Sequence, residues 1–181
     1  MKIQGPYLIQ RGNNKMQEYQ HITHTFDPVY NKHSKILILG SFPSVKSREN
    51  QFYYGHPQNR FWKVLAKLLE EAVPETIEEK KDMLLKHGIA VWDVIASCTI
   101  QGSSDTSIKD VVVNDFSEIL EKTSIERIYV NGTKAYELYH RYAEAKTGIK
   151  AIKLPSTSPA NAAWSLERLC EAWRKEVIYR T

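Results

Sequence analysis

The chain has 181 residues, of which 42% are hydrophobic and 25% are charged, and its formal net charge is +4. This length suits one hydrophobic core, and this composition excludes wholesale disorder. No segment reaches the roughly 18 consecutive apolar residues of a membrane span, and the N-terminus lacks the apolar region of a secretory signal. We therefore expect a cytoplasmic protein with one domain over residues 21–181, preceded by a mobile extension over residues 1–20.

Four short apolar runs alternate with helical patterns along the chain. The first three runs are nearly continuous, which is typical of strands covered on both faces, whereas the fourth alternates more and suits a sheet edge. The predicted strands are 35–40, 89–95, 127–132 and 149–154. The predicted helices are 61–72, 77–86, 113–121 with Asn114 as N-cap, 133–146 and 161–179.

Strands that alternate with helices predict a parallel sheet sandwiched by helices. In such sheets ligands bind outside the carboxyl ends of the strands. Cys98 and Cys170 are the only cysteines and lack metal-ligand spacing, so we expect both to be reduced and buried. No metal or cofactor is expected, and the mild basic excess permits a nucleic-acid partner without arguing for one.

A polar segment with an early glycine follows the first predicted strand. Gly40 would allow a bound group to approach the backbone closely. The chain contains neither GxGxxG nor GxxxxGK[ST], which disfavours a dinucleotide or nucleoside-triphosphate site. The aromatic residues that follow could stack on a base or could simply pack in the core; they are Phe42, Phe52, Tyr53 and Tyr54.

Two further polar segments lie at predicted strand or helix ends. Asn59, in His56-Pro-Gln-Asn, is either a capping amide or an amide that orients a water, and it cannot act as a strong base. The segment 154–161 reads Leu-Pro-Ser-Thr-Ser-Pro-Ala-Asn, and it is either an N-capping turn or a loop that contacts phosphates.

These segments together resemble the uracil-DNA glycosylase superfamily, and within it the hypoxanthine-DNA glycosylase branch (family 6). The resemblance runs from about residue 23 to the C-terminus and rests on 40–44, 53–62, 89–95, 130–132 and 154–161. It implies a three-layer α/β/α sandwich with a short, mainly four-stranded parallel sheet. It also implies excision of a deaminated base from DNA by cleavage of the N-glycosidic bond, without a cofactor.

The resemblance also assigns roles to residues of this chain. It implies catalytic roles for Asn59 and Asn131, although the sequence alone favours a turn amide before Gly132 for Asn131. Where other branches carry a water-positioning Asp or Asn, this chain has Phe42, and where they carry a His or Asn it has Ser156 or Thr157.

The expected base pocket comprises Gly40, Ser41, Phe42, Pro43, Tyr54, His56 and Asp93, with Asp93 either reading the base edge or capping a loop. The expected DNA-binding loop comprises Ser156, Thr157, Ser158, Pro159, Ala160 and Asn161, and the expected phosphate contacts are Lys46, Arg48 and Arg60, each of which could instead be a surface charge.

We expect a monomer that acts on DNA containing a deaminated base. Deoxyinosine is the expected substrate, with deoxyuridine and deoxyxanthosine as further candidates. A purine base can leave through a dissociative path in which placement matters more than strong base catalysis. Two alternatives remain, a non-catalytic binder of nucleic acid or damaged bases and a hydrolase of nucleosides or related small molecules.

Overall fold

The computed structural model describes residues 17–178, and its centre is a four-stranded parallel sheet with the order β3-β2-β6-β7. The strands are β2 (Ile36–Gly40), β3 (Ile89–Asp93), β6 (Arg127–Asn131) and β7 (Ala151–Leu154). All four predicted parallel strands are therefore confirmed. β7 lies at an edge, as its alternating pattern predicted.

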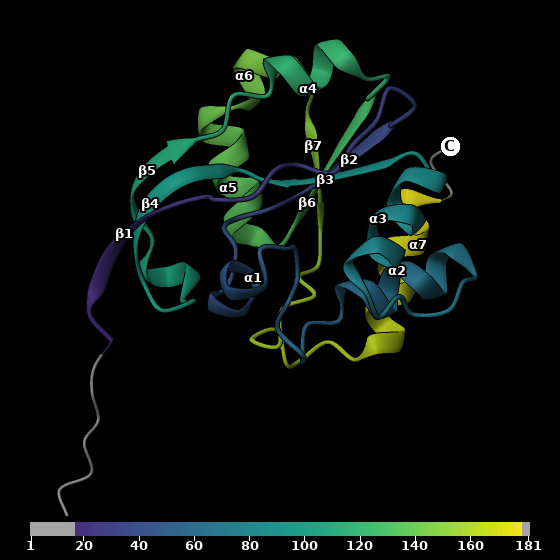
Figure 1. Ribbon diagram of the computed structural model, residues 1–181, viewed down its shortest axis with the longest axis horizontal. Coiled ribbons are helices and arrows are strands. Elements are labelled where there is room, and N and C mark those ends of the chain that lie inside the picture. Colours follow the sequence, from purple (N-terminus) through teal and green to yellow (C-terminus); the bar gives the residue numbers. More distant parts are fainter. Residues whose placement is uncertain (1–16, 179–181) are drawn as a thin grey trace, which may run out of the picture.

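Helices cover both faces of this sheet because its side chains point alternately to two buried clusters. Ile38 and Tyr129 belong to one cluster, with α2, α3 and α7, whereas Leu39 and Val130 belong to the other, with α4 and α5. Figure 1 shows α2, α3 and α7 gathered beside the sheet. The helices are α1 (Val45–Asn50), α2 (Phe61–Leu69), α3 (Ile77–Lys86), α4 (Ser117–Lys122), α5 (Thr133–Tyr142), α6 (Glu144–Thr147) and α7 (Leu166–Val177), with a 3₁₀ turn at Asp105–Ser107. The three-layer α/β/α sandwich is confirmed.

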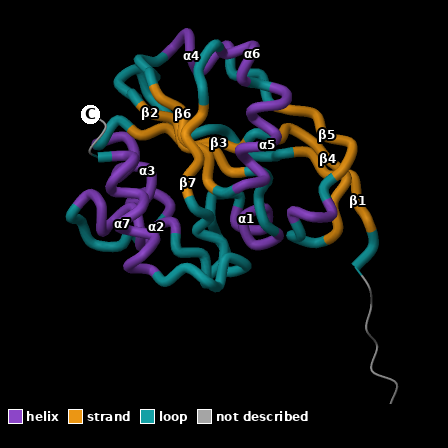
Figure 2. The backbone as a smooth tube through the Cα atoms, turned by 180° about the vertical axis from the view of Figure 1, so that it is seen from behind, coloured by secondary structure: helices purple, strands orange, loops and turns teal. Residues whose placement is uncertain are grey.

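A second, antiparallel sheet with the order β1-β4-β5 was not predicted from the sequence. Figure 2 shows it at the side of the molecule away from α2, α3 and α7. The predicted strand 89–95 ends at Asp93, and after Val94 the chain enters this second sheet. Its strands are β1 (Tyr19–Thr23), β4 (Ile95–Gln101) and β5 (Lys109–Val113).

Several predicted boundaries change for related reasons. The helix expected from residue 113 starts at Ser117, because Val113 ends β5, and the Asn114 side chain donates to the Asp93 carbonyl instead of capping that helix. Tyr19, which was assigned to the extension, opens β1.

The remaining differences concern helix ends. The first predicted helix ends at Leu69 rather than residue 72, and the predicted helix 133–146 is divided between α5 and α6. α7 begins at Leu166 rather than 161 because residues 155–165 form a loop, and the prediction for residue 179 lies outside the described residues, as do those for 1–16.

Cys98 and Cys170 are free and buried, as the sequence predicted. Within residues 17–178, no helix is long and apolar enough to cross a membrane. The same part of the chain holds no cluster of three or more His, Cys, Asp or Glu side chains arranged for a metal ion.

Candidate active site

A small polar cavity of about 110 Å³ lies at the carboxyl ends of β2, β3 and β6, next to the loop that follows β7. The fold brings eleven of the predicted site residues to this cavity: Gly40, Ser41, Phe42, Pro43, Tyr54, Asn59, Asp93, Asn131, Ser156, Thr157 and Ser158. It also brings Tyr53, one of the aromatic residues considered for stacking on a base, and four residues that the sequence did not single out: Ser44, Ser47, Ser103 and Asp105.

Asp93 ends β3 directly beside Gly40, its partner in the parallel pairing with β2. A Cβ atom at position 40 would lie only 2.4 Å from Asp93 Oδ1. The glycine is therefore required here for a close approach, which explains its place at the strand end. It leaves room for Oδ1 of Asp93 beside Gly40, and both residues line the cavity.

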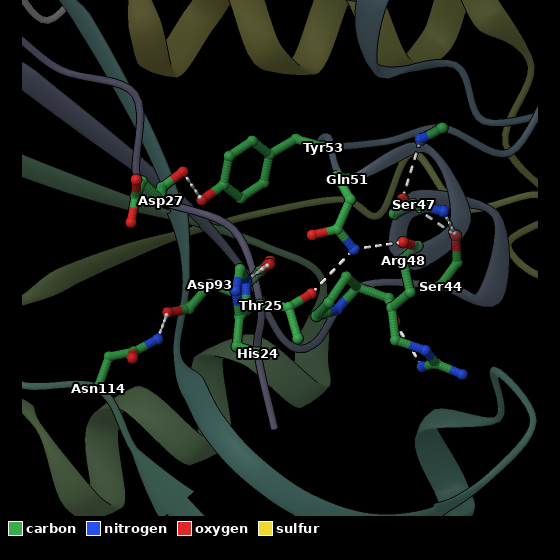
Figure 3. A network of polar contacts seen from close by, with 12 residues as sticks. His24, Thr25, Asp27, Ser44, Ser47, Arg48, Gln51, Tyr53, Asp93 and Asn114 are labelled. Atoms are coloured by element: carbon green, nitrogen blue, oxygen red, sulfur yellow. Dashed lines mark hydrogen bonds and ion pairs between the residues drawn. The ribbon is translucent and has the colours of Figure 1, made fainter. Parts of the chain in front are cut away.

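The other oxygen of Asp93 is held by His24, which follows β1. His24 Nε2 lies 2.8 Å from Asp93 Oδ2, and the two side chains are 4% and 6% exposed (Figure 3). The His24 backbone N–H donates to the Ala96 carbonyl, and the imidazole packs against Phe26 with ring centroids 4.4 Å apart. A carboxylate this buried needs a partner, and His24 supplies it. Sequence reasoning missed His24 because only the pairing of β1 with β4 brings it to Asp93.

Asn59, Thr157 and Asn131 form a continuous chain of hydrogen bonds. The Thr157 hydroxyl donates to Asn59 Oδ1 at 2.9 Å and accepts from Asn131 Nδ2 at 2.9 Å. Asn131 Oδ1 accepts from the Thr157 backbone N–H at 3.0 Å, and Thr157 is fully buried. The two asparagines singled out by sequence are therefore linked through Thr157, a residue of the expected DNA-binding loop.

The aromatic rings are already partly engaged within the protein. Tyr54 stacks on Phe61 with ring centroids 3.8 Å apart. Its hydroxyl is buried, and burial, followed by the charge of Asp93, raises the pKa of Tyr54. The Phe42 ring meets the His24 ring edge-on. The guanidinium of Arg48 lies 5.7 Å from the centroid of the same Phe42 ring. Phe42 and Tyr54, the two aromatic residues of the expected base pocket, therefore each have at least one ring contact within the protein.

The Arg60 side chain donates hydrogen bonds to the backbone of the loop after β7. Its guanidinium donates to the carbonyls of Ser158 and Asn161 at 2.8 and 3.0 Å, and also to the carbonyls of Thr157 and Trp164. Four of its five N–H donors are therefore used by the protein. The structure thus gives Arg60 an internal role that differs from the expected phosphate contact.

The two other basic residues expected to bind phosphate also have protein partners. Lys46 forms an ion pair with Glu49 at 2.7 Å between two exposed side chains, which constrains it little. Arg48 donates to the carbonyls of Pro43 and Gly102.

The remaining predicted residues lie outside the cavity lining. The imidazole of His56 accepts from the Gln58 backbone N–H at 3.1 Å. Ala160 and Asn161 border an adjacent depression, which Lys134 and Lys153 also line. Pro159 lines neither of these two hollows.

Comparisons with known proteins identify a family and named relatives of this chain. The family model of the uracil DNA glycosylase superfamily matches residues 28–177. A hypoxanthine DNA glycosylase of Methanosarcina acetivorans is 38% identical over 157 residues, which cover 86% of this chain and 96% of that protein. A hypoxanthine DNA glycosylase of Methanosarcina barkeri is 34% identical over 138 residues, covering 75% and 86% of the two chains.

The fold is similar to a solved structure as well. The solution NMR structure of a Methanosarcina acetivorans protein assigned as a uracil DNA glycosylase has a TM-score of 0.70 and 38% identity, and the match covers 83% of this chain and 93% of that one. His24 precedes the segment matched by the family model.

Proposed function

Because the chain belongs to the uracil DNA glycosylase superfamily, we propose that it is a monofunctional glycosylase that removes hypoxanthine from deoxyinosine in DNA, with uracil and xanthine as further candidate bases. The two relatives named hypoxanthine DNA glycosylase support this choice of base. The observation that carries the proposal is the cavity at the carboxyl ends of the parallel strands, where Asp93, Asn59 and Asn131 meet.

The base must first leave the stacked duplex. Unstacking and unpairing a base costs a few kcal/mol, and the cost is least for a mispaired base such as deaminated adenine. The cavity would then receive the flipped base, with the sugar and its phosphates at the mouth. Lys134 and Lys153, which line the adjacent depression, would carry charge along the path of the DNA backbone.

Asp93 supplies the chemistry that can recognise a deaminated base. Deamination replaces a ring nitrogen acceptor and its neighbouring amino group by a ring N–H and a carbonyl. Asp93 Oδ1, an acceptor beside Gly40, can accept that N–H, whereas adenine would present a lone pair to the same carboxylate. His24 keeps the carboxylate in this orientation by donating to Oδ2.

The reaction cleaves the bond between C1′ of deoxyribose and N9 of the purine. The bonding electron pair leaves with the base, the oxygen of a water bonds to C1′, and the water releases one proton. Asn59 and Asn131 act as neutral polar groups at the reacting centre, where preorganised dipoles stabilise developing charge. An amine nucleophile is missing from the cavity lining among residues 17–178, so we expect an intact strand with an abasic site as product. Such a site is the first intermediate of base excision repair.

The test is incubation of excess protein with an end-labelled duplex that carries one inosine opposite thymine. We expect an alkali-labile break at the inosine, no break without alkali, and no break in the same duplex with adenine. N59A should abolish the break, whereas Q58A, a change at the exposed neighbour in the same segment, should not. Parallel duplexes with uracil and xanthine rank the candidate bases.

The other outcomes separate the alternatives. Binding of the inosine duplex without any alkali-labile site would refute the proposed reaction and favour a non-catalytic binder. Release of hypoxanthine from free deoxyinosine but not from the duplex would favour a nucleoside hydrolase.

A further inference from the structure

The hydrogen bonds around Asn59 determine which of its polar atoms can meet a bound base. Asn59 Oδ1 accepts from the Phe61 backbone N–H and from the Thr157 hydroxyl, each at 2.9 Å. A carbonyl oxygen has two lone pairs, so both of its acceptor positions are occupied. Asn59 Nδ2 has no protein partner within residues 17–178, and Asn59 lines the cavity. The amide therefore offers donors to the cavity, not an acceptor.

This orientation is imposed from both ends of the chain of hydrogen bonds. A backbone N–H can only donate, so the Phe61 N–H requires the oxygen of Asn59, and the Thr157 N–H requires the oxygen of Asn131. Asn131 must then turn Nδ2 toward the Thr157 hydroxyl, whose own proton is left to donate to Asn59. Reversing either amide would place two donors against each other.

We propose that Thr157 is a positioning residue that fixes Asn59 as a hydrogen-bond donor to the departing base, rather than as an acceptor for the attacking water. This inference rests on the proposed glycosylase function and goes beyond it. The sequence left Asn59 as a capping amide or an orienter of water. Because both acceptor positions of Oδ1 are occupied, Asn59 cannot accept a hydrogen bond from that water.

Donation suits the departure of a purine. As the C1′–N9 bond breaks, its electron pair moves onto the base, and negative charge spreads to the ring nitrogens and the carbonyl oxygen. A donor already in place stabilises this charge without reorganisation. The water adds its oxygen to C1′ and releases its proton to bulk solvent, so no protein group near Asn59 has to act as a base.

N59D separates the two roles with a nearly isosteric change. The carboxylate can still accept from the Phe61 N–H and the Thr157 hydroxyl, but it cannot donate to the base. If Asn59 donates, single-turnover excision of hypoxanthine should fall by about 100- to 1000-fold at neutral pH. Protonation of the new carboxyl group restores a donor, so the N59D rate should rise relative to wild type as the pH falls toward about 4. A rate at neutral pH equal to or above wild type would overturn the inference.

A second pair of variants tests Thr157 itself. T157V keeps the shape of the side chain but removes its hydroxyl, and we expect excision to slow about tenfold while the affinity for inosine DNA changes little. T157S returns the hydroxyl and should recover most of that rate. Equal rates for T157V and T157S would refute the positioning role.

Failure of the proposed function can be distinguished from failure of this inference. A wild-type protein that releases no base from the inosine duplex refutes the proposed function alone. In that case the Asn59 side-chain amide signals in a ¹H–¹⁵N NMR spectrum, identified by their loss in N59D, decide the orientation. We expect them to shift in T157V and to stay near their wild-type positions in T157S, and signals unmoved in T157V would overturn the inference.

Discussion

Replacing Gly40 with alanine should displace the Asp93 carboxylate from the cavity. The added Cβ atom would lie 2.4 Å from Asp93 Oδ1, whereas such contacts are not tolerated below 3.0 Å, so one of the two atoms must move by about 0.6 Å. Both movements are resisted, because Gly40 and Asp93 are paired in adjacent strands and His24 holds the other oxygen of Asp93.

The expected cost follows from this confinement. Overpacking a well-packed site costs about 1–3 kcal/mol, and here it also distorts the buried hydrogen bond between His24 and Asp93. We therefore expect G40A to lower the free energy of unfolding by about 2 kcal/mol, which corresponds to a drop in Tm of about 4–8 °C for a chain of this size. Excision of hypoxanthine should fall with it, because the acceptor proposed to read the base is the displaced atom.

The assay is a double-mutant cycle of G40A and D93A, followed by thermal and urea unfolding. D93A removes the oxygen that the new Cβ atom would meet, so adding G40A to D93A should cost less than about 0.5 kcal/mol. A cost for G40A that is the same in both backgrounds would refute the steric argument. It would show that the glycine matters for some reason other than its approach to Asp93.

Three further predictions concern His24, Cys98 and Arg60. H24F keeps an aromatic ring but leaves the buried Asp93 without its donor, so unfolding measurements should show a loss of about 3 kcal/mol in the free energy of unfolding. The control H21F, at an exposed histidine of β1, should cost less than about 0.5 kcal/mol, and equal losses would contradict the pairing. Burial raises the pKa of the Cys98 thiol to about 11, so only about a thousandth of the Cys98 side chains are thiolate at pH 8. Mass spectrometry should therefore find Cys98 unalkylated by iodoacetamide until the protein is unfolded. Rapid labelling of the native protein would argue against this burial. R60M should accelerate amide hydrogen exchange in the loop after β7, because Arg60 donates hydrogen bonds to the carbonyls of that loop. The slope of the logarithm of the DNA-binding constant against the logarithm of salt concentration should stay unchanged. A slope smaller by about one would show that Arg60 contacts a phosphate.

The parallel sheet was predictable because its strands carry an unambiguous pattern. The segment at β2 is an uninterrupted apolar run that ends in Gly40, and the segment at β6 ends in Asn131 and Gly132. Such runs are buried on both faces, so the local sequence alone reports their environment. The polar residues at their ends could then be assigned to one edge of the sheet, and the structure brings most of them to one cavity.

The antiparallel sheet was not predictable for the opposite reason. β1 is exposed at four of its five positions, and β5 has no buried residue. Strands of this kind are stabilised by their partners rather than by their own apolar pattern. His24 could not be identified before that pairing was known, because its contact with Asp93 spans 69 residues of sequence.

The cavity therefore has two walls that are held by different parts of the fold. His24 reaches Asp93 from the end of β1, where its backbone N–H is bound to Ala96 in the antiparallel sheet. The amides of Asn59 and Asn131 are instead ordered by Thr157, in a loop that Arg60 holds. In the proposed function, the first wall offers the Asp93 carboxylate to the ring N–H of the base, and the second offers the Asn59 amide donors to the leaving group. Selection and cleavage in the proposed function therefore depend on separate supports. Phe42 stands where the resemblance places a water-positioning residue, and in this proposal the polar groups that line the cavity act on the base rather than on the water.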